Sequence, residues 1–167
     1  MTVKISALLA GAAVSLAVAS LAHAEVSAAD RAFVGKVSQG GMFEAVAGKL
    51  AEKKAIAQDV KDFAATDVHD HDLVNGKLKG IAGNKKLPIA DKLNPELQGM
   101  LDKLNGLDGP AFDAGYMKIM GEIHKKDGGL FAIEAQTGAD PDLKAFAAET
   151  VKIVNRHIGA IHGAMPE

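Results

Sequence analysis

Apolar residues recur every three or four positions along most of the chain, and this spacing predicts α-helices. Two long helices are expected first, over residues 28–54 and 57–82. The stretch GNKKLPIADKL (83–93) then forms a connection, because Pro88 cannot continue a helix. No segment alternates polar and apolar residues for long, and β-branched residues are sparse. The sequence therefore predicts an all-α fold.

Three prolines, Pro95, Pro110 and Pro141, mark the starts of later helices. Asn94 and Asp140 each precede a proline, as expected when Asn or Asp caps a helix and proline takes its first position. The helices predicted from these signals are a short one over about 95–104, a third long one from 110 and a fourth long one over about 141–163. Within the third long helix, Gly128-Gly129 predicts a weakened or kinked turn.

The chain contains two internal matches between its halves. VKDFAA (60–65) resembles LKAFAA (143–148), and RAFVG (31–35) resembles PAFDA (110–114). Duplication of a helical hairpin would produce such matches, and so would chance in Ala-rich helices. Duplication favours a ferritin-like four-helix bundle, with a short crossover helix between the second and third long helices, over a simple up-down bundle.

The N-terminal segment has the features of a secretory signal peptide. Lys4 precedes an apolar run over 5–21, and Ala22-His23-Ala24 provides a small-x-small cleavage site. The alternative is a membrane anchor. Cleavage after Ala24 would leave residues 25–167 as a single four-helix-bundle domain, periplasmic or otherwise exported, with no transmembrane segment in the mature chain.

Composition excludes several classes of function. The chain has no Cys, so it forms no disulfide and offers no thiolate ligand. After residue 24 there are 18 basic residues against 21 acids, and the whole chain has one Tyr and no Trp, which argues against nucleic-acid binding. Serine is scarce and no phosphate-binding loop or nucleophile elbow is present. The sequence leaves enzymatic activity uncertain. Of the possible functions, catalysis is the least supported. A protein partner or homo-oligomer stays open.

The run TDVHDHD (66–72) combines three acids with two histidines. Asp67 and His71 lie one turn apart and interrupt an apolar stripe of the second helix. Asp70 lies on the flank of that stripe, whereas His69 and Asp72 fall well off it and are expected to face solvent.

The first helix carries one candidate acid, Glu44. It lies on a stripe with Gly41 and Gly48, where glycines would let a neighbouring backbone approach closely. The alternative is that Glu44 faces solvent and that the helix buries instead the apolar residues Phe43, Ala47 and Leu50.

The third and fourth helices contribute histidines. On the third helix, His124 flanks a predicted seam of Phe112, Ile119, Ile123, Leu130 and Ile133. Met117 and Met120 either join His124 as soft ligands for copper or simply fill the core. On the fourth, His157 lies about 50 degrees from the centre of the seam. His162, near the helix end, is expected to be structural, and Arg156 is a candidate partner for a carboxylate.

Inward acids and histidines must pair or hold a metal, because burying uncompensated charge costs several kcal/mol. The candidate metal ligands are Glu44, Asp67, Asp70, His71, His124 and His157. This set would suit a transition metal ion such as Zn, Cu, Fe or Mn. No Glu-x-x-His is present, which argues against a dinuclear iron centre and favours a mononuclear site or a structural polar network.

Four stretches carry a resemblance to a known family. GGMFEAVAGKLAEKKA, VKDFAATDVHDHDLVNGKLKGIA, FDAGYMKIMGEIHKKDGGLF and DLKAFAAETVKIVNRHIGAIH together resemble the bacterial secreted domain-of-unknown-function family 4142, from about residue 29 to 162. The resemblance implies an exported ferritin-like four-helix bundle. The family's recurring polar residues fall here on Glu44, Asp70, His71, Asn75, Asp113, Tyr116, His124 and His157. This chain differs from the family's pattern at two places. It has Asp67 where Met is common, and Gly128-Gly129 where residues that favour helices are usual.

Two functions are compatible with these observations. The first is an exported protein that binds a metal ion within the bundle, in metal homeostasis or stress. The alternative is a non-enzymatic envelope protein, structural or interacting, with a buried polar network. The first requires the histidines to converge within ligand distance, and the second expects them to pair with Arg156, Tyr116 or Asn75.

Overall fold

The computed structural model describes residues 26–164, and all regular structure within them is helical. The predicted signal peptide lies outside these residues. The helices are α1 (Ala28–Lys54), α2 (Gln58–Asn84), α3 (Pro95–Asn105), α4 (Gly109–Thr137) and α5 (Pro141–Ala164). The predicted elements are therefore all present, and every helix end that was predicted lies within about two residues of its observed position.

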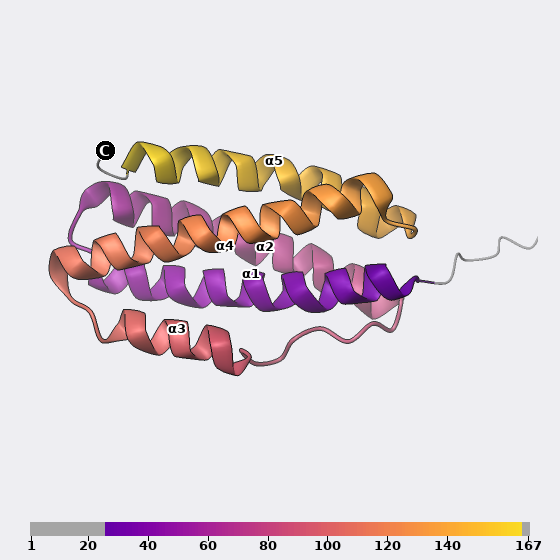
Figure 1. Ribbon diagram of the computed structural model, residues 1–167, viewed down its shortest axis with the longest axis horizontal. Helices are drawn as coiled ribbons and strands as arrows, with labels where there is room; N and C mark the ends of the chain where they lie inside the picture. The colour runs from indigo at the N-terminus through magenta and orange to yellow at the C-terminus, as the bar shows by residue number, and fades with distance from the viewer. Residues whose placement is uncertain (1–25, 165–167) are drawn as a thin grey trace, which may run out of the picture.

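Four long helices pack side by side and α3 lies along the outside of the bundle (Figure 1). Helices α1 and α2 form one antiparallel hairpin and α4 and α5 another; α1 also packs on α4, and α2 on α5. A long connection carrying α3 returns the chain along the bundle from the end of α2 to the start of α4. Consequently, each long helix has two long neighbours and buries a broad face.

Side-chain caps explain where three helices begin. Ser27 and Asp30 form a capping box at the start of α1. The Asn94 side chain accepts from Leu97 N at 2.9 Å, directly before Pro95. Asp140 accepts from Leu143 N at 3.1 Å at the start of α5. The cap-then-proline signals in the sequence are thus confirmed for α3 and α5.

The predicted apolar seam of α4 is partly wrong. Ile133 is 62% exposed, whereas His124 is fully buried and Asp127 is 6% exposed. The buried face is rotated toward polar residues, which an apolar-stripe rule assigns to the flank. Gly128-Gly129 does not break α4. A Cβ at Gly128 would lie 3.1 Å from Val154 Cγ1, so this glycine permits close packing of α4 on α5.

The core consists of two apolar clusters separated by a polar layer. One contains Phe43, Phe63 and Phe112, and the other contains Phe33, Phe131 and Phe146. Between them along the four long helices lie the buried polar residues Glu44, Asp67, His71, His124, Asp127 and His157. Glu44 was predicted to face either the core or the solvent, and it is buried, with 2% of it exposed. Phe43 and Ala47, the apolar residues of the alternative prediction, are buried as well.

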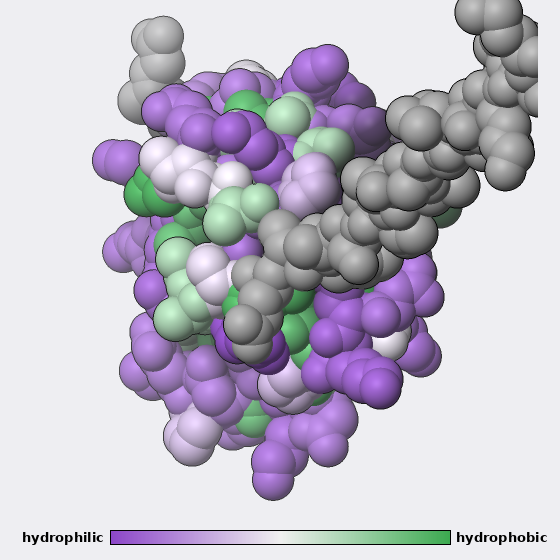
Figure 2. All heavy atoms as spheres, turned by 90° about the vertical axis from the view of Figure 1, so that its right-hand side faces the viewer, coloured by the Kyte–Doolittle hydropathy of each residue, from purple (hydrophilic) through white to green (hydrophobic). Residues whose placement is uncertain are grey.

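One end of the bundle has a mostly polar surface. The end of the bundle seen in Figure 2 shows mainly hydrophilic residues, with apolar ones in small separate patches. Among residues 26–164, no helix combines the length and apolar character needed to cross a bilayer.

Candidate metal centre

Three of the four long helices direct four buried ligand-type side chains to one point in the polar layer. We call Asp67, His71, His124 and His157 the histidine cluster. Asp67 and His71 come from successive turns of α2, His124 from α4 and His157 from α5. Their side chains are at most 4% exposed. One ligand atom from each residue lies within 4.8 Å of all the others.

The spacing of these atoms matches a tetrahedral metal site. Oδ1 of Asp67 lies 3.4 Å from Nε2 of His71, 3.2 Å from Nε2 of His124 and 3.2 Å from Nδ1 of His157. The His124 and His157 nitrogens are 3.0 Å apart. Metal–ligand bonds of about 2.0–2.1 Å in a tetrahedron separate the ligand atoms by about 3.3–3.4 Å. Four of the six distances between the ligand atoms are thus close to tetrahedral values and all are within 4.8 Å, so the cluster can hold one ion.

Hydrogen bonds fix which nitrogens face the centre. His124 Nδ1 lies 2.9 Å from the Met120 carbonyl oxygen, which only accepts, so Nδ1 carries the proton. His157 Nε2 lies 2.8 Å from Asp70 Oδ2 and donates to that carboxylate. In neutral rings, the remaining nitrogens of both residues present lone pairs to Asp67. This arrangement requires a proton or a metal ion between them.

The carboxyl groups around the cluster differ in charge. Burial raises the pKa of Asp67, but His124, His157 and His71 oppose it and hold the pKa well below its ordinary range. Burial raises the pKa of Glu44 well above its ordinary range; His124 opposes this, while Asp67 adds to it. Asp67 is accordingly the anionic group at the centre.

Several buried polar atoms of the cluster have no hydrogen-bond partner. Both carboxylate oxygens of Asp67 and both ring nitrogens of His71 are in this state, as is the hydroxyl of Tyr116. Buried polar groups are nearly always satisfied in folded proteins, so orphaned atoms of ligand type point to a bound species. A divalent cation of imidazole-binding preference fits this donor set.

Two further acids contact the cluster from outside. Glu44 lies 3.2 Å from Nδ1 of His71 and 3.4 Å from Nδ1 of His124, on the side away from Asp67. Asp70 bonds His157 and also pairs with Arg156, whose side chain is 58% exposed. These acids occupy positions that orient ligand rings rather than ligand positions.

Close helix approach makes room for the polar layer. A Cβ at Gly41 would lie 2.2 Å from Asn75 Oδ1, and one at Gly48 would lie 2.5 Å from Val68 Cγ2. A close approach was expected at these glycines and is present, but side chains of α2, rather than its backbone, make the nearest contacts. Phe63 lies edge-on to the rings of His124 and His157, with centroids 6.1 and 6.0 Å away, and seals one side of the cluster.

The sequence-predicted candidates separate into three groups. Asp67, His71, His124 and His157 converge, Glu44 and Asp70 lie behind the histidines, and His69, Asp72 and His162 are exposed. Met117 and Met120 lie in the apolar core. Asp127 was not among the candidates, although its spacing of three from His124 puts both on one face of α4.

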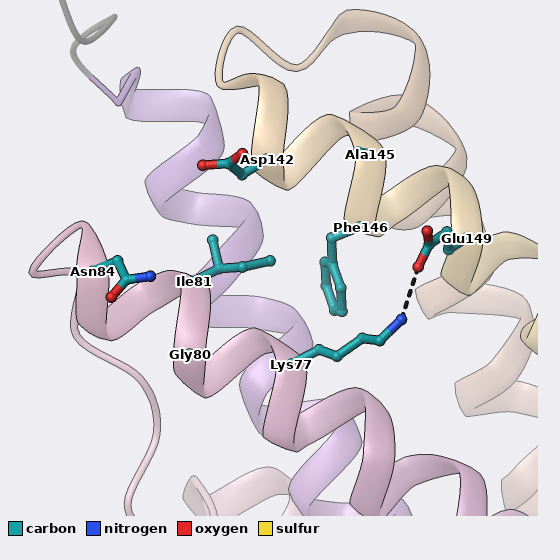
Figure 3. Close-up of a pocket in the computed structure, with 8 residues that line it drawn as sticks. All are labelled: Lys77, Gly80, Ile81, Asn84, Asp142, Ala145, Phe146 and Glu149. Atoms are coloured by element: carbon teal, nitrogen blue, oxygen red, sulfur yellow. Dashed lines mark hydrogen bonds and ion pairs between the residues drawn. The ribbon is translucent and has the colours of Figure 1, made fainter.

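The groove between α2 and α5 lies apart from the cluster. Figure 3 shows it lined by Ile81 and Phe146 and bordered by Lys77 and Glu149, whose side chains form a 2.8 Å ion pair. None of the residues that line it belongs to the histidine cluster. This groove offers no ligand-type arrangement comparable to the polar layer.

The fold and site define an all-helical bundle with a buried histidine and carboxylate cluster. The chain belongs to the domain-of-unknown-function family DUF4142, whose model matches residues 15–163. A search of curated proteins gives no match. The structure is similar to the crystal structure of a DUF305 fragment from Deinococcus radiodurans, with a TM-score of 0.73 and 13% identity, over 83% of this chain and 95% of that chain. This likeness concerns the fold.

Proposed function

We propose that this protein binds one divalent transition-metal ion within the bundle, through Asp67, His71, His124 and His157. The observation that carries the proposal is the convergence of two histidine lone pairs and one further histidine nitrogen on a single carboxylate oxygen. In this scheme the Asp67 carboxylate neutralises half of the ion's charge and the three imidazoles complete four-coordination.

A binding role is favoured over catalysis. Four protein ligands complete a tetrahedral shell, whereas catalytic metal sites keep a position for water or substrate. The ligands are almost fully buried, and aromatic and apolar side chains surround them. We infer a part in holding or buffering the metal, in homeostasis or stress.

The proposal includes export and a ferritin-like arrangement. The signal-peptide features of residues 1–24 support delivery to the periplasm, or otherwise outside the cytoplasm. The long crossover between α2 and α4 supports the ferritin-like arrangement. Cell fractionation tests the location, and N-terminal sequencing of the mature protein should begin at Glu25.

The second candidate function is a metal-free structural protein with a buried polar network. The His157–Asp70–Arg156 chain favours it, because this is the kind of pairing that such a network would use. It leaves the oxygens of Asp67 and the ring nitrogens of His71 without hydrogen bonds, however, and is therefore the weaker proposal.

The test is metal stoichiometry and affinity of the mature chain, measured by elemental analysis and by titration with Zn²⁺, Cu²⁺ and Co²⁺. The native chain should bind one ion. His71→Ala should weaken binding by more than about a hundredfold, because the loss of a direct ligand exceeds the 10–100-fold loss typical of outer-shell changes.

A matched control is available on the same helix. His69 is exposed two residues earlier, so His69→Ala should leave stoichiometry and affinity unchanged. Equal losses in the two variants, or no binding by the native chain, would support the metal-free alternative.

A further inference from the structure

A surface cleft leads toward the histidine cluster from the side of α3. Its volume is about 280 Å³, and it lies between α1, the start of α3 and α4. Lys36 and Lys126 line it together with Glu96 and Asp127, so the acids and bases balance. The lining charges of the cleft therefore sum to zero, and Asp127 is the acid among them that also reaches the interior.

A much smaller cavity lies deeper in the bundle. It measures about 10 Å³, enough for roughly one water-sized particle. Glu44, His71 and Asn75 line it, and so does Asp127. The Nδ1 atom of His71 is buried and faces Glu44 Oε2 at 3.2 Å, so the cavity is lined by a ligand-type nitrogen and a carboxyl group.

Asp127 is common to the cleft and the inner cavity. Its side chain is 6% exposed and lies directly against the α1 backbone, where a Cβ at Gly40 would clash with Oδ2. Burial raises its pKa to about 6, against the opposing charges of Lys126, His124 and His71. A single carboxyl thus separates the open cleft from the cavity beside the cluster.

The opposite side of the cluster is less suited to an incoming cation. There Asp70 is already bonded to His157 and to Arg156. A cation arriving by that side would meet the guanidinium charge and would have to displace it.

We propose that a divalent transition-metal ion enters and leaves the histidine cluster through the cleft between α1, α3 and α4, with Asp127 as the carboxylate that binds it in transit. The ion passes from Asp127 into the cavity beside Glu44 and His71 and then to the histidine cluster. This inference rests on the proposed metal binding, and it adds a transit site and a route.

The test measures rates rather than equilibrium. Co²⁺ uptake is followed by absorbance after rapid mixing, and release by transfer to an excess of chelator. Asp127→Asn should slow uptake and release together by about tenfold or more, because an attracting charge on the route is lost. The stoichiometry should remain that of the native chain.

A second pair of variants tests the route without touching a polar group. Gly35 lines the cleft, and a Cβ there meets nothing within 4 Å, so Gly35→Leu starts from open space and places an apolar side chain at the cleft. Gly80 lines the groove between α2 and α5 and is equally open, which makes Gly80→Leu the matched control (Figure 3). Only Gly35→Leu should slow exchange.

The outcomes separate the two proposals. Unchanged stoichiometry with slower exchange in Asp127→Asn and Gly35→Leu supports the route. Native exchange rates in both variants, or faster exchange in Arg156→Gln alone, would overturn the route while leaving metal binding intact. A native chain that binds no Co²⁺, Zn²⁺ or Cu²⁺ would overturn both.

Discussion

Two of the places where the described residues bury acids satisfy them in different ways. The histidine cluster lies in the polar layer halfway along the bundle. The second place, which we call the acidic end cluster, consists of Asp30, Glu134 and Asp140, near the turn between α4 and α5. All three residues are at most 4% exposed.

In the acidic end cluster, backbone amides bond to Asp30 and Asp140, although one oxygen of Glu134 has no hydrogen-bond partner. Asp30 accepts from Ser27 N at 3.0 Å, Ala139 N at 3.0 Å and Asp140 N at 3.2 Å. Lys85 Nζ lies 2.7 Å from Asp140 Oδ2. In the histidine cluster, by contrast, neither oxygen of Asp67 has a hydrogen-bond partner. The difference teaches that acids which accept hydrogen bonds from backbone amides hold chain segments together. An acid that faces imidazoles and accepts no hydrogen bond is suited instead to binding a metal ion with them.

The largest effect on folding is expected at Asp30. Asp30→Ala removes the acceptor for amides at the α4–α5 turn and should lower the free energy of unfolding by on the order of 3 kcal/mol. Asp67→Asn, measured with chelator present, should cost less than Asp30→Ala, because no backbone amide bonds to the Asp67 oxygens and Asn retains the shape of the side chain. Urea unfolding measures both. Equal losses would remove the distinction between the two places.

Metal should stabilise the protein through the histidine cluster alone. With free metal at about 100 times Kd, the free energy of unfolding should rise by about 2.7 kcal/mol. Thermal unfolding with and without Zn²⁺ measures the rise. His157→Ala should abolish it, and His162→Ala, an exposed change five residues later, should not. A rise that survives His157→Ala would assign the ion to another site.

The acidic end cluster should make stability depend on pH. Burial, the charge and hydrogen bond of Asp30, and the charge of Asp140 raise the pKa of Glu134 to about 7. The folded state therefore retains a proton that the unfolded state gives up. Its stabilising contribution is full below about pH 4.5 and is lost as the pH rises through 7.

Glu134→Gln isolates this contribution. Between pH 5 and 8, the native chain should lose on the order of 1–2 kcal/mol more stability than Glu134→Gln. Denaturant unfolding at several pH values measures the difference. Parallel profiles for the two proteins would show that Glu134 carries no such proton.

The smallest effect is expected at the solvent side of the histidine cluster. Arg156 pairs with Asp70, but its side chain is 58% exposed. Arg156→Gln should change the free energy of unfolding by less than about 1 kcal/mol in urea unfolding, as is usual for exposed ion pairs. A larger loss would mean that the pair is part of a structural network and would favour the metal-free alternative.

Much of the fold could be predicted from local signals. The caps and prolines at Asn94 and Asp140 determine where α3 and α5 begin, and these signals act within one helical turn. The buried face of α4 was harder to predict. Ile133 is exposed and Asp127 is buried, because the burial of a residue depends on which helices pack on each side.

The candidate site could be predicted in part. The spacing of Asp67 and His71 was sufficient to place both on one face of α2, and both are buried. Asp70 differs from Asp67 only by its position on the helix, yet it bonds His157 from outside. The parts played by Glu44 and Asp127 depend on glycines of α1 that let other side chains approach, which no single helix reveals.

The sequence by itself determined the helices, their ends and the residues that interrupt their apolar stripes, because these depend on neighbours within a turn or two. His124 and His157 are 33 residues apart in the chain, and only the tertiary structure decided that they meet at Asp67. That meeting depends on how α2, α4 and α5 are rotated and aligned, and packing between helices sets both.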